Sequence, residues 1–196
     1  MKIPTHYASC EETIKGSRFL AELFLISSQA QVREKIKAQK QKYPDATHVC
    51  HAFICGKNAE IMGMSDDGEP SGTAGRPMLD VLKGSGATNL LVTITRWFGG
   101  TLLGTGGLVH AYGNGVKNVL AVAEFEELVE KSDFSLVCDY QQYQVVKKVF
   151  ENFNLYDVAE DFGEAITIKG QIAQTDFDPF SKKIFDATNG KVQIKN

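Results

Sequence analysis

The stretch SDDGEPSGTAGRPMLDVL (residues 65–82) changes abruptly from a loop rich in glycine, proline and acidic residues to an apolar segment. Glycine permits positive φ and proline suits the first turn of a helix, so Gly75-Arg76-Pro77 predicts a loop that leads into a helix. The apolar side of that helix comprises Met78, Leu79, Val81 and Leu82. Its first-turn amides lack intrahelical partners and lie at the positive end of the helix dipole, where an anion can bind. A well-capped turn without a ligand explains the same residues, because capping residues are common.

A second glycine-rich segment, FGGTLLGTGGLVHAYG (residues 98–113), follows the same pattern. The β-branched, apolar run at 89–97 predicts a central strand, after which the glycine-rich loop leads into another helix. If the two helix N-termini lie side by side, their amides and nearby cations form one site for a phosphate or a nucleic-acid backbone. The predicted site comprises Ser71, Thr73, Gly75, Arg76, Arg96, Gly99, Gly100, Thr105, Gly106 and Gly107. Tight packing of strands against helices is the alternative explanation of the glycines.

Other kinds of chemistry have less support in the sequence. It contains no Walker A loop, no GxGxxG, and no GxSxG or HExxH pattern. His48, Cys50 and His51 are close in sequence, but alternation along a strand places His51 on the opposite face, so we expect no metal site. Asp66 and Asp67, to which Glu69 could add a further carboxylate, remain an alternative with His51 as a general base, and this alternative would make the protein a small hydrolase. In the preferred interpretation we expect no catalytic residue and no cofactor.

The composition is that of an ordinary soluble globular protein. The 196 residues are 43% hydrophobic and 23% charged, with a net charge of -3, which excludes binding of nucleic acid through bulk positive charge. No apolar run approaches the roughly 20 residues that span a bilayer, and the N-terminal residues lack the apolar core of a signal peptide. The four cysteines show no CxxC spacing, which predicts reduced thiols. We therefore expect a cytoplasmic protein without membrane contact.

The first part of the chain alternates strand-like and helix-like segments. Strand patterns occur at 16–26, 47–55 and 59–65. The segment SSQAQVREKIKAQKQKYP (27–44) has helical spacing and carries a basic stripe of Arg33, Lys37 and Lys40. A solvated helix face explains this stripe better than a nucleic-acid surface does.

A cluster of glutamates between 124 and 130 precedes a new strand pattern and marks a domain boundary near residue 130. The segments beyond it follow the order βαββαβ, with strands at 132–140, 156–162, 164–173 and 191–195 and helices at 142–154 and 178–190. This order is typical of the ferredoxin-like fold, which carries many unrelated functions. We therefore predict an α+β protein with two domains, 1–130 and 131–196.

Long motifs in the first domain resemble the signature of the YigZ/IMPACT family. They are SDDGEPSGTAGRPMLDVL (65–82) and TRWFGGTLLGTGGLVHAYG (95–113), with KGSRF (15–19) and HVCHAF (48–53) matching earlier segments. Arg76 and Arg96 match the family pattern, whereas Leu102 and His110 stand where members often carry basic residues. The resemblance implies an N-terminal α/β domain of the ribosomal-protein and elongation-factor type, followed by a ferredoxin-like domain similar to one of elongation factor G.

The resemblance implies RNA or the translation machinery as partners. Eukaryotic members regulate translational initiation through protein contacts that involve a separate domain, so that activity is not transferred to this chain. We expect a regulatory or binding protein of translation that contacts RNA, the ribosome or translation factors through the glycine-lined anion site. Two alternatives stay open: the small hydrolase described above, and a regulator that binds only proteins.

Overall fold

The structure, a computed structural model, describes residues 1–195 and divides into two compact units. One unit spans Met1–Leu128 and the other begins at Val129, in the same acidic segment where the sequence indicates a boundary. Both units combine helices with antiparallel strands. The prediction of two domains of mixed α and β structure is confirmed.

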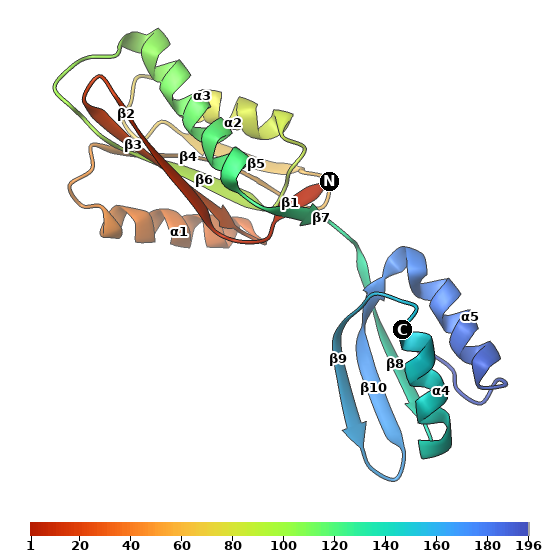
Figure 1. The fold of residues 1–196 in the computed structure, drawn as a ribbon. Coiled ribbons are helices and arrows are strands. Elements are labelled where there is room, and N and C mark those ends of the chain that lie inside the picture. The colour runs from red at the N-terminus through yellow and green to blue at the C-terminus, as the bar shows by residue number, and fades with distance from the viewer. Residues whose placement is uncertain (196) are drawn as a thin grey trace. The chain divides into compact units, whose positions relative to one another are not determined.

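The first unit is a five-stranded antiparallel sheet with helices on both faces. Its elements are β1 (Lys2–Pro4), β2 (Ala8–Ile14), β3 (Ser17–Leu25), α1 (Gln29–Lys42), β4 (His48–Cys55), β5 (Ile61–Ser65), α2 (Gly75–Gly84), β6 (Leu90–Trp97), α3 (Gly104–Val122) and β7 (Phe125–Glu127). The strand order is β2-β3-β6-β4-β5, and β1 pairs separately with β7. Helices α2 and α3 cover one face of the sheet and α1 covers the other (Figure 1).

The central strand β6 divides its side chains between the two cores. Leu90, Val92 and Ile94 pack beneath α2 and α3, whereas Leu91 packs on the opposite face with Val32 of α1. All five side chains are buried. Strand alternation accounts for this division, and it explains why the apolar residues at 90–92 are consecutive: both faces of the strand are covered.

The second unit packs two helices against a three-stranded sheet. Its elements are β8 (Lys131–Cys138), α4 (Tyr140–Phe150), β9 (Leu155–Phe162), β10 (Ile166–Ala173), the 3-10 turn η1 (Gln174–Asp176) and α5 (Phe177–Ala187), with strand order β8-β10-β9. A capping box of Asp139 and Gln142 begins α4. The rings of Phe134, Phe150 and Phe180 meet in the core, with centroids 5.1 Å apart between Phe134 and Phe180.

The prediction of a final strand at 191–195 is wrong. The only pairing there, within the described residues, is one antiparallel bridge between Lys195 and Ser135 of β8, with two backbone hydrogen bonds of 2.8 Å. The chain leaves α5 through a tight turn in which the N–H of Val192 donates to Oγ1 of Thr188 (3.2 Å). Val192 is buried in the core, so the apolar pattern of this segment reflects packing and not a strand ladder.

Candidate functional site

Two adjacent strands position the first polar side chains of the site. His48 of β4 lies directly opposite Arg96 of β6 in the sheet register. His48 shares the face covered by α2 and α3 with Cys50, and His51 lies on the other face, as strand alternation predicted. Burial lowers the pKa of His51, and its Nδ1 has no hydrogen-bond partner among the described residues. Within residues 1–195, no group of three or more His, Cys, Asp or Glu side chains is arranged to hold a metal ion.

The amides at the start of α2 bind a carboxylate of the chain itself. Asp66 Oδ1 accepts hydrogen bonds from the N–H groups of Ala74 (3.0 Å) and Gly75 (2.8 Å), and Oδ2 accepts one from Gly72 (2.9 Å). Partial burial raises the pKa of Asp66, but the three amides outweigh it and hold the pKa below its usual value. Thr73 donates to the carbonyl of Pro70 (2.6 Å). The expectation that the α2 amides hold an external anion is therefore corrected: Asp66 fills that place.

The two aspartates of the hydrolase alternative both stabilise the 65–75 turn. Asp67 Oδ2 accepts from the N–H of Val49 (2.8 Å), and Lys40 binds the other oxygen, Oδ1. The oxygens of Asp66 are occupied by backbone amides. The structure thus assigns structural contacts to Asp66 and Asp67, and these carboxylates are not arranged as a free acid and base pair.

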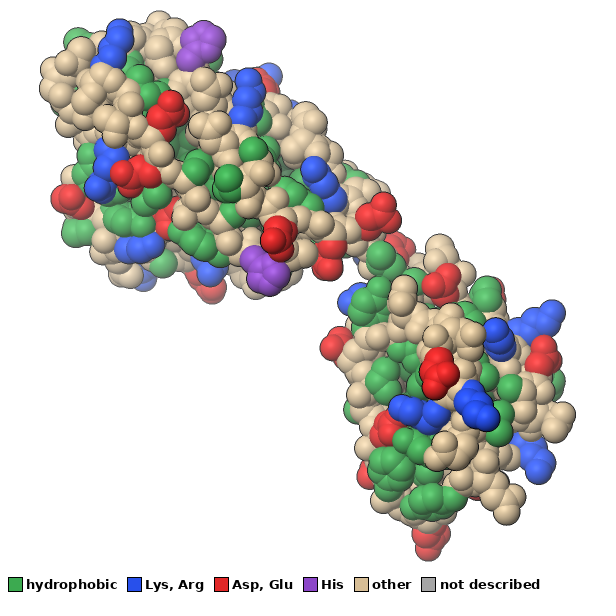
Figure 2. Space-filling model, viewed as in Figure 1, with side chains coloured by type: hydrophobic (Ala, Val, Ile, Leu, Met, Phe, Trp, Pro, Cys, Tyr) green, Lys and Arg blue, Asp and Glu red, His purple; other side chains and the backbone are tan. Residues whose placement is uncertain are grey.

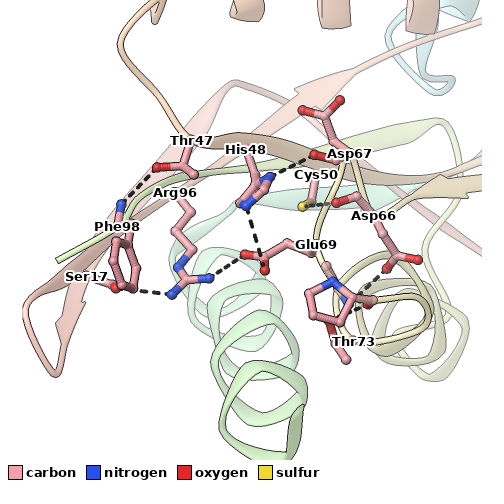
Figure 3. A network of polar contacts seen from close by, with 12 residues as sticks. Ser17, Thr47, His48, Cys50, Asp66, Asp67, Glu69, Thr73, Arg96 and Phe98 are labelled. Carbon is pink, nitrogen blue, oxygen red and sulfur yellow. Dashed lines mark hydrogen bonds and ion pairs between the residues drawn. The ribbon is translucent and has the colours of Figure 1, made fainter. Parts of the chain in front are cut away.

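Glu69 is the centre of a buried polar network (Figure 3). Its Oε1 accepts from Nη1 of Arg96 (2.7 Å) and from the hydroxyl of Tyr112 (2.7 Å). Arg96 also donates to Oγ of Ser17 (3.3 Å). The thiol of Cys50 donates to the carbonyl oxygen of Asp66 (3.0 Å), and it lies 3.4 Å from the hydroxyl oxygen of Tyr112. Burial raises the pKa of Cys50 to about 12 and raises that of Tyr112, so both stay protonated donors. The network therefore contains one buried ion pair, Arg96 with Glu69.

A pocket of about 420 Å³ opens above this network. Its polar lining residues include His48, Glu69, Arg96 and Thr105. Its apolar lining residues are Pro70, Phe98, Leu102, Leu103 and Leu108. Leu102 is 82% exposed and Phe98 is 47% exposed, although both are apolar. The pocket brings together two predicted site residues, Arg96 and Thr105, with a mainly apolar wall that is accessible from solvent.

The N-terminus of α3 forms one edge of this pocket. Its N-cap residue, Leu103, makes no side-chain capping bond. A Cβ on Gly99 would overlap the carbonyl group of Gly16, so packing explains Gly99. A Cβ on Gly106 would meet nothing within 4 Å, and Gly106 is not among the positive-φ glycines. The fold therefore gives no packing reason for glycine at 106, where glycine costs helix stability and leaves the first-turn amides open to solvent.

Arg76 does not lie in the same pocket as Arg96. It lines a second pocket of about 400 Å³ between α2 and α3, together with Asp80, His110 and Lys117. Its Nε lies 3.0 Å from each carboxylate oxygen of Asp80, one helical turn away, and both side chains are more than half exposed. The single anion pocket expected from the sequence is therefore two neighbouring pockets along α3.

The charged surface of the first unit is mixed. Figure 2 shows Lys and Arg side chains scattered among Asp and Glu on the face in view. On α1, Lys40 binds Asp67, and Lys42 lies 3.1 Å from the buried carboxylate of Glu22, whereas Lys37 is exposed. The basic stripe of α1 is therefore partly engaged in ion pairs, and the face in view offers no continuous basic surface.

Comparison with known proteins decides the family. The Impact N-terminal domain model matches residues 15–120, just over half of the chain. The chain belongs to the IMPACT family. A second model, a domain of unknown function (DUF1949), matches residues 136–191. The resemblance noted in the sequence is thus confirmed over both domains.

Relatives of similar length cover both domains of this IMPACT family chain. An IMPACT family member of Haemophilus influenzae is 37% identical, and IMPACT family member YigZ of Escherichia coli is 32% identical; each alignment covers 98% of this chain and 95% of the relative. A crystal structure of a hypothetical protein aligns with a TM-score of 0.69 and 32% identity, over 98% of this chain and 95% of that chain. No helix among the described residues is long and apolar enough to cross a membrane.

Several residues of the pocket were not predicted from the sequence. From the sequence, Glu69 is only a further carboxylate of the hydrolase alternative, and His48 has no role beyond a rejected metal site. Glu69 and His48 lie close together because of the strand register and the path of the 65–75 turn, and both depend on contacts between residues that are far apart in the sequence. One local signal was available: Phe98 and Leu102 are large apolar residues within a glycine-rich loop, a position where exposure is expected.

Proposed function

We propose that this protein is a binding protein of the translation machinery that contacts single-stranded RNA through the pocket at the N-terminus of α3 and the groove beside it. Family membership supports the link to translation, because regulation of translation is what the resemblance implies. The four free cysteines fit a reducing compartment, so we propose the cytoplasm. The observation that carries RNA contact is the pocket itself, which joins uncapped helix amides, a buried guanidinium and an exposed aromatic ring.

The two pockets fit different parts of a nucleotide. Arg76 and Lys117, in the groove between α2 and α3, suit a phosphate, and the α3 amides add partial positive charge nearby. The ring of Phe98 suits stacking of an unpaired base. In this arrangement one strand runs along the first turns of α3, with its backbone on the groove and one base in the pocket.

Few cations take part, so binding should depend weakly on salt. With about 2 to 4 neutralised phosphates, log K falls against log salt with a slope of about -1.4 to -2.8 for a single strand. Arg76 is 60% exposed, which limits its contribution to about 1 kcal/mol, roughly a fivefold change in affinity. The net charge of -3 means that the protein as a whole does not attract RNA, so the attraction must come from the few cations near the pocket.

The test is a salt titration of fluorescence anisotropy with labelled single-stranded RNA for wild type, Arg76→Ala and the matched control Arg33→Ala. Arg33 is an exposed arginine on α1, on the other face of the sheet. We expect Arg76→Ala to weaken binding about fivefold, and Arg33→Ala to leave it unchanged. Equal losses in both variants, or no binding at low salt, would contradict the proposal.

A regulator that binds proteins is the second candidate, favoured by the exposure of Leu102. A side chain that is 82% exposed beside a mainly apolar pocket is also what a peptide-binding surface presents. Affinity purification with wild type and Leu102→Asp separates the candidates. Loss of a protein partner in Leu102→Asp, with no RNA in either eluate, would favour this second function.

A further inference from the structure

The floor of the α3 pocket carries hydrogen-bond acceptors that the network leaves unused. Glu69 Oε1 accepts from both Arg96 and Tyr112, but among the described residues no donor lies within hydrogen-bond distance of Oε2. The nearest charged partner of Oε2 is Nε2 of His48, at 3.9 Å, which is too long for a hydrogen bond. The Glu69 side chain is 2% exposed, so solvent is largely excluded from this oxygen.

The tautomer of His48 follows from its other contact. His48 Nδ1 lies 2.8 Å from the backbone carbonyl oxygen of Asp67 (Figure 3). A carbonyl oxygen only accepts, so Nδ1 carries the proton, and in the neutral ring Nε2 is an acceptor. Two acceptors, Nε2 of His48 and Oε2 of Glu69, therefore lie 3.9 Å apart and side by side, so that two adjacent donor groups of a ligand can each reach one of them.

We infer that this pocket recognises the donor edge of an unpaired guanine, with the base stacked on Phe98. Guanine carries N1–H and the N2 amino group side by side, so it offers adjacent donors to the two acceptors. Uracil has one N–H between two carbonyl oxygens, which would face the acceptors, and adenine and cytosine place a ring acceptor beside their amino group. A buried acceptor left without a donor is costly, so the pocket discriminates against bases that lack the matching edge.

The pocket has the size and the walls for this ligand. Its volume of about 420 Å³ exceeds that of one purine, and the apolar side chains of Pro70, Leu103 and Leu108 line it together with Phe98. The guanidinium of Arg96 lies 5.6 Å from the Phe98 ring centroid and donates a hydrogen bond to Oε1, the other oxygen of the Glu69 carboxylate. Arg96 thus fixes the orientation that directs Oε2 toward His48. This inference rests on the proposed RNA-binding function, because it names the base that the same site selects.

The experiment compares three labelled nine-nucleotide RNAs on the full chain: all uridine, the same strand with one central guanosine, and the same strand with one central inosine. Inosine keeps N1–H but lacks the N2 amino group. We expect guanosine to bind about tenfold more tightly than inosine or uridine, the effect of one hydrogen bond to a charged acceptor. In Glu69→Gln, the preference for guanosine over inosine should disappear, because the amide nitrogen replaces an acceptor with a donor. The matched control Glu34→Gln, an exposed glutamate on α1, should keep the preference.

The outcomes separate this inference from the function on which it rests. Equal affinities of wild type for all three RNAs would overturn guanine recognition and leave RNA binding intact. No binding of any of the RNAs would overturn the proposed function itself. The comparison of guanosine with inosine uses only wild-type protein, so it decides the inference even if Glu69→Gln does not fold.

Discussion

Removal of Arg96 should strongly destabilise the first unit. The substitution Arg96→Ala leaves the carboxylate of Glu69 buried, with Tyr112 as its remaining hydrogen-bond donor. Loss of one partner from a buried ion pair costs about 3 to 5 kcal/mol, because the other charge stays desolvated. Urea unfolding followed by fluorescence measures this cost in the first unit alone, since Trp97 is the only tryptophan of the chain and belongs to β6.

A double variant separates the charge from the loss of packing. Arg96→Met combined with Glu69→Leu removes both charges, and its free energy of unfolding should return to within about 2 kcal/mol of wild type. The remaining loss is that of the hydrogen bond that the Tyr112 hydroxyl donates to Glu69. Arg33→Ala, at an exposed position, is the matched control and should change stability by less than about 0.5 kcal/mol. A single variant Arg96→Ala within 1 kcal/mol of wild type would refute the buried pair.

Three further predictions concern the turn and the glycines. Asp66→Asn should cost about 1 to 3 kcal/mol at neutral pH, measured by urea unfolding, because a carboxylate accepts three amides there. The folded-state pKa of Asp66 lies below its reference value of 3.8, so the contribution of Asp66 to the free energy of unfolding is full above pH 3.8 and is lost as the pH falls through the folded-state pKa. A cost of Asp66→Asn that persists unchanged at about pH 2 would contradict this assignment. Gly99→Ala should destabilise the first unit by about 2 kcal/mol or more through its clash with Gly16, seen as a lower urea midpoint. Gly106→Ala should leave stability equal or slightly raised yet weaken RNA binding severalfold in the anisotropy assay, and unchanged binding would count against the α3 amides as a contact.

The sequence predicts the elements best where both faces of a segment are buried. Leu90, Leu91 and Val92 are consecutive apolar residues because the sheet is covered on both sides, and the run that contains them forms β6. Strand β2 was not predicted, because Glu11 and Glu12 give its exposed edge position a polar pattern. The segment at 191–195 has a strand-like pattern, but its buried Val192 follows a turn.

The site was predicted only in part, because several of its contacts join residues that are far apart in the sequence. Local residues indicated glycine-rich turns leading into helices at Gly75 and at Thr105, and the two helices begin at Gly75 and Gly104. The pairing of Arg96 with Glu69 joins residues 27 positions apart and depends on strand register, which hydrophobic patterning does not specify for polar side chains. The occupation of the α2 amides by Asp66 could have been inferred, since an aspartate just before a glycine-rich loop is a typical acceptor for helix N-terminal amides.

The proposed function places RNA at the N-terminus of α3. It is tested most directly by ¹⁵N NMR of the full chain during titration with the guanosine-containing nine-nucleotide RNA. We expect saturable chemical-shift changes at the amides of Thr105 and Gly106 and at Nε of Arg96, with the chemical shifts of the α1 amides unchanged. Shifts confined to α1 or to the second unit, with Thr105, Gly106 and Arg96 unchanged at saturation, would contradict it.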